Sequence, residues 1–315
     1  MKRYSRFAFL FVVIYALSFG GAFSLSAQSG DTGSSLRARS AALAKGESVA
    51  AVQDSGTNSG GHYIGNEYAV KLARERRLPF KDGEQLTYTL GYKWGSINSD
   101  VGEGVITTSF ADSTFSAVID GRTTKLFDLF FKVREHFETT VSLRTMRPLK
   151  FLRESHEGKY SMINRYTFNP DYSINAQIIR MGEAAPDTLL QGNAYTYDLV
   201  SLYFSARCID FTNVELDTKH PIAFAIDKTI YNLYFVYRGK DVISVKGIGK
   251  FNALKFNVRL VAGEVFTGND EMTLWVSDDS NKIPLLFESK ILKGTVYGRL
   301  KKYNNLAWPM SSKIK

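Results

Sequence analysis

The sequence is poor in the residues that most often mark cross-links or chemistry. It has a single cysteine, Cys208, so no internal disulfide can form and stability must come from a packed core. We expect Cys208 itself to be a small buried hydrophobic residue rather than a nucleophile. No cysteine follows the apolar run near the N-terminus, which excludes the anchor of a bacterial lipoprotein.

Histidine is equally scarce, and no metal or catalytic motif is present. None of the four histidines stands at metal-ligand spacing from another, and Glu154–Lys159 lacks the second histidine of a zinc-binding helix. The chain has no Gly-x-Ser-x-Gly element, and Gly247–Lys250 lacks the strand–helix frame of a nucleotide-binding loop. We therefore predict that the protein is not an enzyme and has no cofactor or metal.

Long hydrophobic runs are absent except at the N-terminus. There, Lys2, Arg3 and Arg6 precede the apolar run Phe7–Phe19, and small residues follow it. The order basic, apolar, small predicts a cleaved signal peptide over residues 1–27, with an uncleaved anchor as the alternative. We expect a periplasmic protein associated with the outer membrane, with no transmembrane span after signal removal.

Acidic residues are fewer than basic ones, and the formal net charge is +9. A basic exported protein can meet anionic lipid, polysaccharide or an acidic partner, whereas export argues against nucleic acid. Arg74, Arg76 and Arg77 cluster at the end of a helical pattern over residues 66–78. They either complement the helix dipole or form a surface for an anionic partner.

Large apolar residues are also rare between the signal peptide and this helix. Residues 28–65 are rich in Ser, Gly and Ala, which predicts a flexible leader. The composition changes at Pro79, and we predict an antiparallel β domain over residues 79–304. Residues 305–315 form a C-terminal tail.

Alternation of apolar and polar residues dominates the β domain. In Gln85–Trp94, for example, every second side chain is large and apolar, and similar segments recur between Gly- and Asp-containing turns. Such a period of two is typical of half-buried antiparallel strands. We therefore predict an all-β, mainly antiparallel fold: a closed or half-open β-barrel-like sheet with one packed α-helix and a short N-terminal helix.

The packed helix is predicted at Tyr197–Arg207. Leu199, Leu202, Tyr203 and Ala206 recur there at helical spacing, and Asp198 stands at the N-cap position. We expect this helix to cover one mouth or face of the sheet.

The segment WVSDDSNKIPL contains two adjacent carboxylates, Asp278 and Asp279. All five residues of SDDSN are turn formers, and neighbouring side chains on an extended chain point to opposite sides. We therefore predict a turn rather than a metal or catalytic site. Beyond Pro284 the apolar positions change from odd to even near residues 291–293, which predicts a bulge or a sheet corner.

Three segments carry a family resemblance: FKDGEQLTYTLGYKWGSI, YDLVSLYFSAR and LWVSDDSNKIPLLFESKILKGTVYGRL. In this order they resemble the domain of unknown function 3108 family, exported bacterial proteins with a β-rich domain, over approximately residues 79–302. The family has no assigned reaction, so the resemblance implies no catalytic role. The positions that match its recurring residues are Asp198, Ser201, Asp279, Pro284 and Gly294.

From these features we predict a non-catalytic interaction component of a cell-envelope or secretion assembly, with an envelope protein as partner. The alternative is a binding module in which the curved sheet holds an amphiphile or a glycan, that is, a lipid or glycan ligand. In that case the ligand would be lined by aromatic residues: Tyr88, Tyr92, Trp94, Tyr231 and Tyr237. The competing interpretation is that these side chains fill the core.

Overall fold

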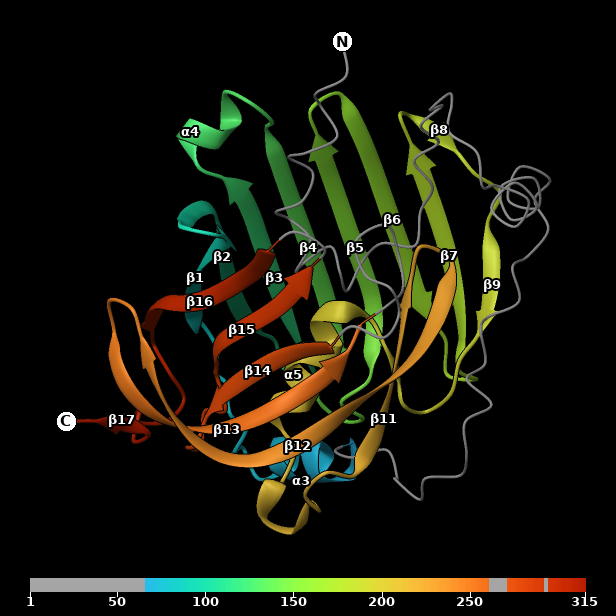
Figure 1. Ribbon diagram of the computed structural model, residues 1–315. Helices are drawn as coiled ribbons and strands as arrows, with labels where there is room; N and C mark the ends of the chain where they lie inside the picture. The colour runs from blue at the N-terminus through green and yellow to red at the C-terminus, as the bar shows by residue number, and fades with distance from the viewer. Residues whose placement is uncertain (1–65, 261–270, 292–293) are drawn as a thin grey trace, which may run out of the picture. The chain divides into compact units, whose positions relative to one another are not determined.

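The computed structural model describes residues 66–260, 271–291 and 294–315. The predicted signal peptide (1–27) and leader (28–65) lie outside these residues. In the described part, strands dominate and helices are short, which confirms the all-β prediction (Figure 1). The helical elements are α3 (Asn66–Arg74), α4 (Lys125–Asp128), α5 (Leu199–Arg207) and a 3₁₀ turn, η2 (Phe211–Asn213).

The strands follow one another in a continuous ladder. The first group comprises β1 (Gln85–Trp94), β2 (Ile97–Phe110), β3 (Thr114–Thr123), β4 (Val133–Ser142), β5 (Pro148–Glu157), β6 (Tyr160–Phe168), β7 (Ser173–Arg180), β8 (Glu183–Ala184) and β9 (Thr188–Gln191). The second group comprises β10 (Thr196–Tyr197), β11 (Lys219–Ile226), β12 (Thr229–Val245), β13 (Gly249–Arg259), β14 (Glu271–Ser277), β15 (Pro284–Ile291), β16 (Gly294–Asn304) and β17 (Lys313–Ile314). Strand β1 joins the groups because it pairs with both β2 and β16. Every described pairing is antiparallel except the short one between β10 and β11.

Among the described strands, no backbone pairing joins the two ends of this ladder, β7 with β8 and β9 at one end and β10 with β11 at the other. The tight turn between β11 and β12 connects them through side chains instead. Its residues Asp227 and Lys228 both have positive φ, as a two-residue hairpin turn requires. Asn164 Nδ2 donates to Asp227 Oδ1 at 3.0 Å, and Lys228 N donates to Tyr166 Oη at 3.2 Å.

A buried polar cluster on the inner face of β4 and β5 supports this connection. Arg153 is fully buried, and its Nε donates to Glu135 Oε2 at 3.2 Å, while its guanidinium lies 4.0 Å from the Asp227 carboxylate. Ser155 donates to both Glu135 and Glu157. Burial raises the pKa of Asp227. Since an isolated buried charge is costly, these groups stabilise the fold only together.

The bulge or corner was predicted near residues 291–293, of which 292 and 293 lie outside the described residues. Strand β15 ends at Ile291, β16 begins at Gly294, and the two are antiparallel neighbours rather than one bent strand. A change of strand alters the parity of the apolar positions as effectively as a bulge, and KILKGTV contains none of the Asn-Gly or Asp-Gly signals that mark short hairpins. Gly294 has φ +118°, and a Cβ there would overlap the carbonyl oxygen of Lys93.

The turn predicted at SDDSN is confirmed, and it separates its two carboxylates. Asp278 forms an ion pair at the surface with Lys240, 2.8 Å away. Asp279 turns inward, where Oδ1 accepts from Asn281 N at 3.0 Å and Oδ2 accepts from Ser312 Oγ at 2.7 Å. Residues 305–315, predicted as a tail, are therefore bound to the β domain, and β17 pairs with β13.

The predicted helix forms as α5, and a buried capping box holds its N-terminus. Asp198 Oδ1 accepts from Val200 N at 2.8 Å and Ser201 N at 2.9 Å, while Ser201 Oγ accepts from Asp198 N. The second oxygen, Oδ2, accepts from Thr139 Oγ1 of β4 at 2.7 Å. The cap therefore both starts the helix and fixes it to the sheet.

The buried cap predicts a pH-dependent stability. Burial raises the pKa of Asp198 to about 6, so the folded chain holds this proton more tightly than the unfolded chain, where aspartate titrates near 4. Stability should therefore fall as pH rises from about 4 to about 6. We expect the free energy of unfolding of the natural chain, measured by urea denaturation relative to Asp198→Asn, to decrease by on the order of 3 kcal/mol over this range. A pH-independent difference would contradict this.

Candidate functional site

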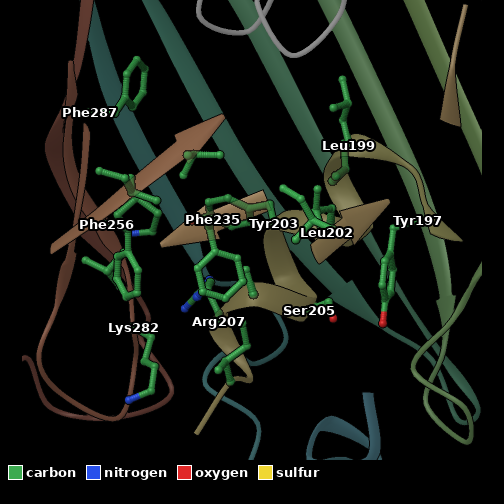
Figure 2. A pocket seen from close by; sticks show the side chains of 18 of the residues that line it. Tyr197, Leu199, Leu202, Tyr203, Ser205, Arg207, Phe235, Phe256, Lys282 and Phe287 are labelled. Atoms are coloured by element: carbon green, nitrogen blue, oxygen red, sulfur yellow. The ribbon is translucent and has the colours of Figure 1, made fainter. Parts of the chain in front are cut away.

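An apolar cavity of about 290 Å³ lies beside α5, between the two groups of strands (Figure 2). This is about twice the volume of an engineered apolar cavity that holds benzene. Its walls come from distant parts of the sequence: β1 to β4 on one side, β11 to β15 on the other, and α5 between them. Side chains that line it from the strands include Leu90, Ile106, Ile119, Ile222, Met272 and Leu274.

Helix α5 is apolar on both of its sides. Leu199, Leu202, Tyr203 and Ala206 line the cavity, and Val200 both lines it and belongs to the main core, where Phe204 is fully buried. Helical spacing predicted Leu199, Leu202, Tyr203 and Ala206 as the packed stripe, and the structure leaves that stripe against the cavity. A helix that is apolar all round is normally enclosed on all sides, so open space along one side is an unusual feature.

Aromatic rings form the wall opposite the helix. Phe235 and Phe256 lie edge to face with ring centroids 6.0 Å apart, and both point towards α5 in Figure 2. Phe287 of β15 lies over Gly298 of β16, where a Cβ would overlap its ring. The glycine therefore allows a close approach of the Phe287 ring to the backbone of β16.

Arg207, at the end of α5, lines the cavity but is fully engaged by the protein. Its two terminal nitrogens donate to the Glu84 carboxylate at 2.5 and 3.0 Å, and Nε donates to Asn281 O at 3.0 Å. A further bond reaches Pro79 O at 2.9 Å. Arg207 therefore joins α5 to the start of β1 and to the β14–β15 turn, and its donors are not available to a ligand.

Lys282 is the other charged residue on the lining. Its Nζ is 3.4 Å from Asp279 O and lies 6.0 Å from the centroid of the Phe211 ring. It forms no ion pair with any residue in the described ranges. Figure 2 shows its amine at one end of the cavity, pointing away from the phenylalanine rings. The site therefore combines an apolar space with one positive charge at its end.

The aromatic residues predicted as a ligand lining do not come together. Tyr88 lines the cavity, and its hydroxyl donates to a backbone carbonyl at 2.9 Å. Tyr92 and Tyr237 pack in a hydrophobic cluster with Phe235 and Phe256, Tyr231 packs in a neighbouring cluster, and none of the three lines the cavity. Trp94 is 55% exposed at the end of β1. Most of the lining was missed because its residues share the period-two pattern of ordinary core residues.

The predicted arginine surface lies at the end of α3. Arg74, Arg76 and Arg77 are all exposed, and Arg77 makes only a 3.9 Å contact with Glu75. None of them lines the cavity. Their role as a surface for an anionic partner stays a prediction.

The described residues contain neither a metal-binding cluster nor a membrane-spanning helix. No group of three or more His, Cys, Asp or Glu side chains in these residues is placed to hold a metal ion. No helix within the described ranges has the length and apolarity needed to cross a bilayer.

A family model described as "Protein of unknown function (DUF3108)" matches residues 87–301, which include all the strands that line the cavity. The chain belongs to the DUF3108 family. No curated protein matches the sequence. Four of the residues singled out by the sequence resemblance hold the walls in place: Asp198 and Ser201 cap α5, Asp279 anchors the β14–β15 turn, and the Pro284 carbonyl binds Tyr88.

Solved structures resemble the fold at low sequence identity. The chain is similar to a beta-barrel-like protein of domain of unknown function DUF1849 from Brucella abortus, with 9% identity, 72% of this chain and 98% of that chain covered, and a TM-score of 0.53. Two others have lower scores: a putative lipoprotein from Parabacteroides distasonis (11% identity, 72% and 97% covered, TM-score 0.29) and a DUF1329 protein from Desulfovibrio piger (8% identity, 79% and 95% covered, TM-score 0.22). The first supports a barrel-like fold for this DUF3108 chain.

The buried ion pair predicts a strong asymmetry between single and double substitutions. We expect Arg207→Met to lower the free energy of unfolding by about 3–5 kcal/mol, because Glu84 is left charged and buried. Adding Glu84→Gln should recover more than half of this loss, as measured by urea denaturation. Arg238→Met, which breaks an exposed pair with Asp217 (2.7 Å), is the control and should cost less than about 1 kcal/mol. If Arg207→Met and Arg238→Met lowered the free energy of unfolding by similar amounts, the assigned role of Arg207 would be contradicted.

Proposed function

We propose that this DUF3108 protein binds an amphiphile and holds its hydrocarbon chain in the cavity beside α5. The cavity carries this proposal. Its lining is almost entirely apolar and includes Ala206, which is exposed, so this space of about 290 Å³ communicates with solvent. A hydrocarbon chain that entered it would remove apolar surface from water, which is favourable by about 25 cal/mol per Å².

The lining favours an amphiphile over a glycan, the other ligand predicted from the sequence. A buried sugar presents many hydroxyl groups, each of which is costly to bury without a hydrogen-bond partner. The polar groups on the lining are few and are already engaged: Arg207 with Glu84, and Tyr88 with the Pro284 carbonyl. Apolar side chains form the rest of the wall, and they suit an alkyl chain.

The charge at the end of the cavity favours an anionic head group. Lys282 forms no close ion pair in the described residues, although it helps to lower the pKa of the nearby Asp210, whereas Arg207 is bound directly by Glu84. A carboxylate or phosphate beside Lys282 would leave the alkyl chain directed towards Phe235 and Leu202. The ligand class is therefore a single-chain anionic amphiphile of the fatty-acid type.

We further propose that the sheet is a half-open barrel whose gap admits this ligand. Its two ends are linked by the side-chain bonds of Asn164 and Tyr166 to the β11–β12 turn, rather than by a backbone ladder. Such contacts can open without breaking a strand pairing. Export, outer-membrane association and a role in an envelope or secretion assembly stay predictions from the sequence, and an exported protein would meet amphiphiles in that compartment.

The proposal predicts that filling the cavity abolishes binding. We expect Ala206→Trp to weaken binding of dansyl-labelled undecanoic acid at least about tenfold, because the indole occupies the space of the alkyl chain. Fluorescence titration of the purified chain measures the affinity, and circular dichroism checks folding. Ala184→Trp, on exposed β8, is the matched control and should bind normally. Absence of binding by the natural chain, or equal binding by Ala206→Trp, would overturn the proposal.

The head-group assignment has a separate test. Lys282→Met keeps the length of the side chain and removes its charge, so binding of the fatty acid should weaken about tenfold. Binding of the corresponding uncharged amide should change little, because the apolar wall is unaltered. The ratio of the two affinities is the measurement. Equal losses for acid and amide would show that Lys282 does not recognise the head group.

A further inference from the structure

The segment between β3 and β4, Lys125–Lys132, exposes an unusual amount of apolar surface. Its sequence is KLFDLFFK, and Leu126 is 63%, Leu129 79% and Phe130 62% exposed. A single exposed leucine is ordinary. Three large hydrophobic side chains exposed within five residues form a patch, and such patches mark interaction sites. We call this segment the α4 tip.

The α4 tip is held in one conformation by its own backbone. Asp128 N donates to Thr124 O at 2.9 Å, and the Phe127 carbonyl accepts from Phe130 N at 2.9 Å and Phe131 N at 2.8 Å. The Phe131 ring packs inward over Gly158. The outward direction of Leu126 and Leu129 is therefore built into a hydrogen-bonded turn and does not result from a loose loop.

Charge on the α4 tip is positive at its surface. Lys125 and Lys132 flank the apolar residues, both are exposed, and neither forms an ion pair with a residue in the described ranges. Its one acid, Asp128, is bound at the base by Arg134, with Nη2 2.6 Å from Oδ2. The Arg134 guanidinium keeps the pKa of Asp128 at about 2. The Asp128 carboxylate therefore stays ionised, and the positive charge of Arg134 balances its negative charge.

Two further exposed hydrophobic residues lie at the same end of the strands. Trp94, 55% exposed, ends β1, and Met181, 57% exposed, follows β7. Because β1 to β7 are sequential antiparallel neighbours, the ends of β1, β3 and β7 lie on one side of the sheet. Figure 1 shows α4 and β8 at this common end.

We propose that this end of the sheet docks on a lipid bilayer that contains anionic lipids, with Leu126 and Leu129 inserted at the level of the head groups. Apolar residues bordered by lysines, with a nearby tryptophan, match the chemistry of the membrane interface. A stable protein interface needs roughly 1,000 Å² or more of buried surface, which favours broad complementary faces over a short projecting turn. A bilayer accepts such a turn without a matching groove.

Site-specific fluorescence tests this docking directly. Leu129→Cys in the full chain is labelled with the dye NBD; Cys208 is buried and its pKa is raised to about 12, so it should not react. Vesicles of phosphatidylcholine mixed with phosphatidylglycerol should shift the emission to the blue and protect the dye from dithionite. Tyr172→Cys, in the β6–β7 turn at the opposite end of the strands, is the control and should show neither effect. An unshifted, quenchable dye at position 129 overturns the proposal.

Vesicle co-sedimentation supplies the second measurement. Leu126→Ser with Leu129→Ser should lower the vesicle partition coefficient at least about tenfold, and substituting Leu189 and Leu216, which are exposed elsewhere, should not. Equal losses for the two pairs, or a crosslink from position 126 to a protein without the NBD shift, would overturn membrane docking. No residue of the α4 tip lines the cavity, so ligand binding should be unchanged and the two proposals fail separately.

Discussion

The architecture depends on how α5, a helix of nine residues, is held between the two groups of strands. An isolated helix of this length is marginal in water, so the surrounding protein must supply its stability. It does so with a buried ionisable group at each end. Asp198 closes the N-terminus and binds Thr139 of β4, and Arg207 at the C-terminus binds Glu84 before β1. Both attachments reach the first group of strands, and Arg207 also binds the β14–β15 turn, so the helix is fixed beside the cavity.

The same use of buried polar groups connects the two ends of the sheet. A closed barrel satisfies every edge strand by backbone pairing, whereas here the β11–β12 turn is held by Asn164, Tyr166 and the Arg153 cluster. These charges lie on inward positions where hydrophobic residues would otherwise pack. Their cost of burial is offset only in the assembled arrangement, so they specify one position of the turn. They also leave the junction between β6 and the β11–β12 turn dependent on side chains, whereas β1 joins the two groups of strands by backbone pairing at the other junction.

The cavity and the α4 tip suggest complementary tasks for this DUF3108 chain. The cavity offers an apolar space with the amine of Lys282, which forms no close ion pair in the described residues, at its end, and this suits a fatty-acid-like ligand. The α4 tip offers exposed leucines between two lysines, which suit the surface from which such a ligand would come. Each feature rests on different residues and different physics: one on unfilled volume, the other on exposed apolar area. A protein with both would exchange an amphiphile with a bilayer while docked on it.

The sequence by itself determined which residues alternate between inside and outside, where α5 lies, how Asp198 caps it, and that Asp278 and Asp279 form a turn. These properties depend on a few neighbouring residues, and local periodicity and turn chemistry report them directly. Only the tertiary structure decided that Ile291 and Gly294 belong to two paired strands rather than one bent strand, that Arg207 pairs with Glu84 over 123 positions, and which side of α5 faces open space. A cavity exists where two distant surfaces fail to meet. Its lining has the same hydrophobic pattern as a filled core, because the pattern records which side chains avoid water and not what lies opposite them.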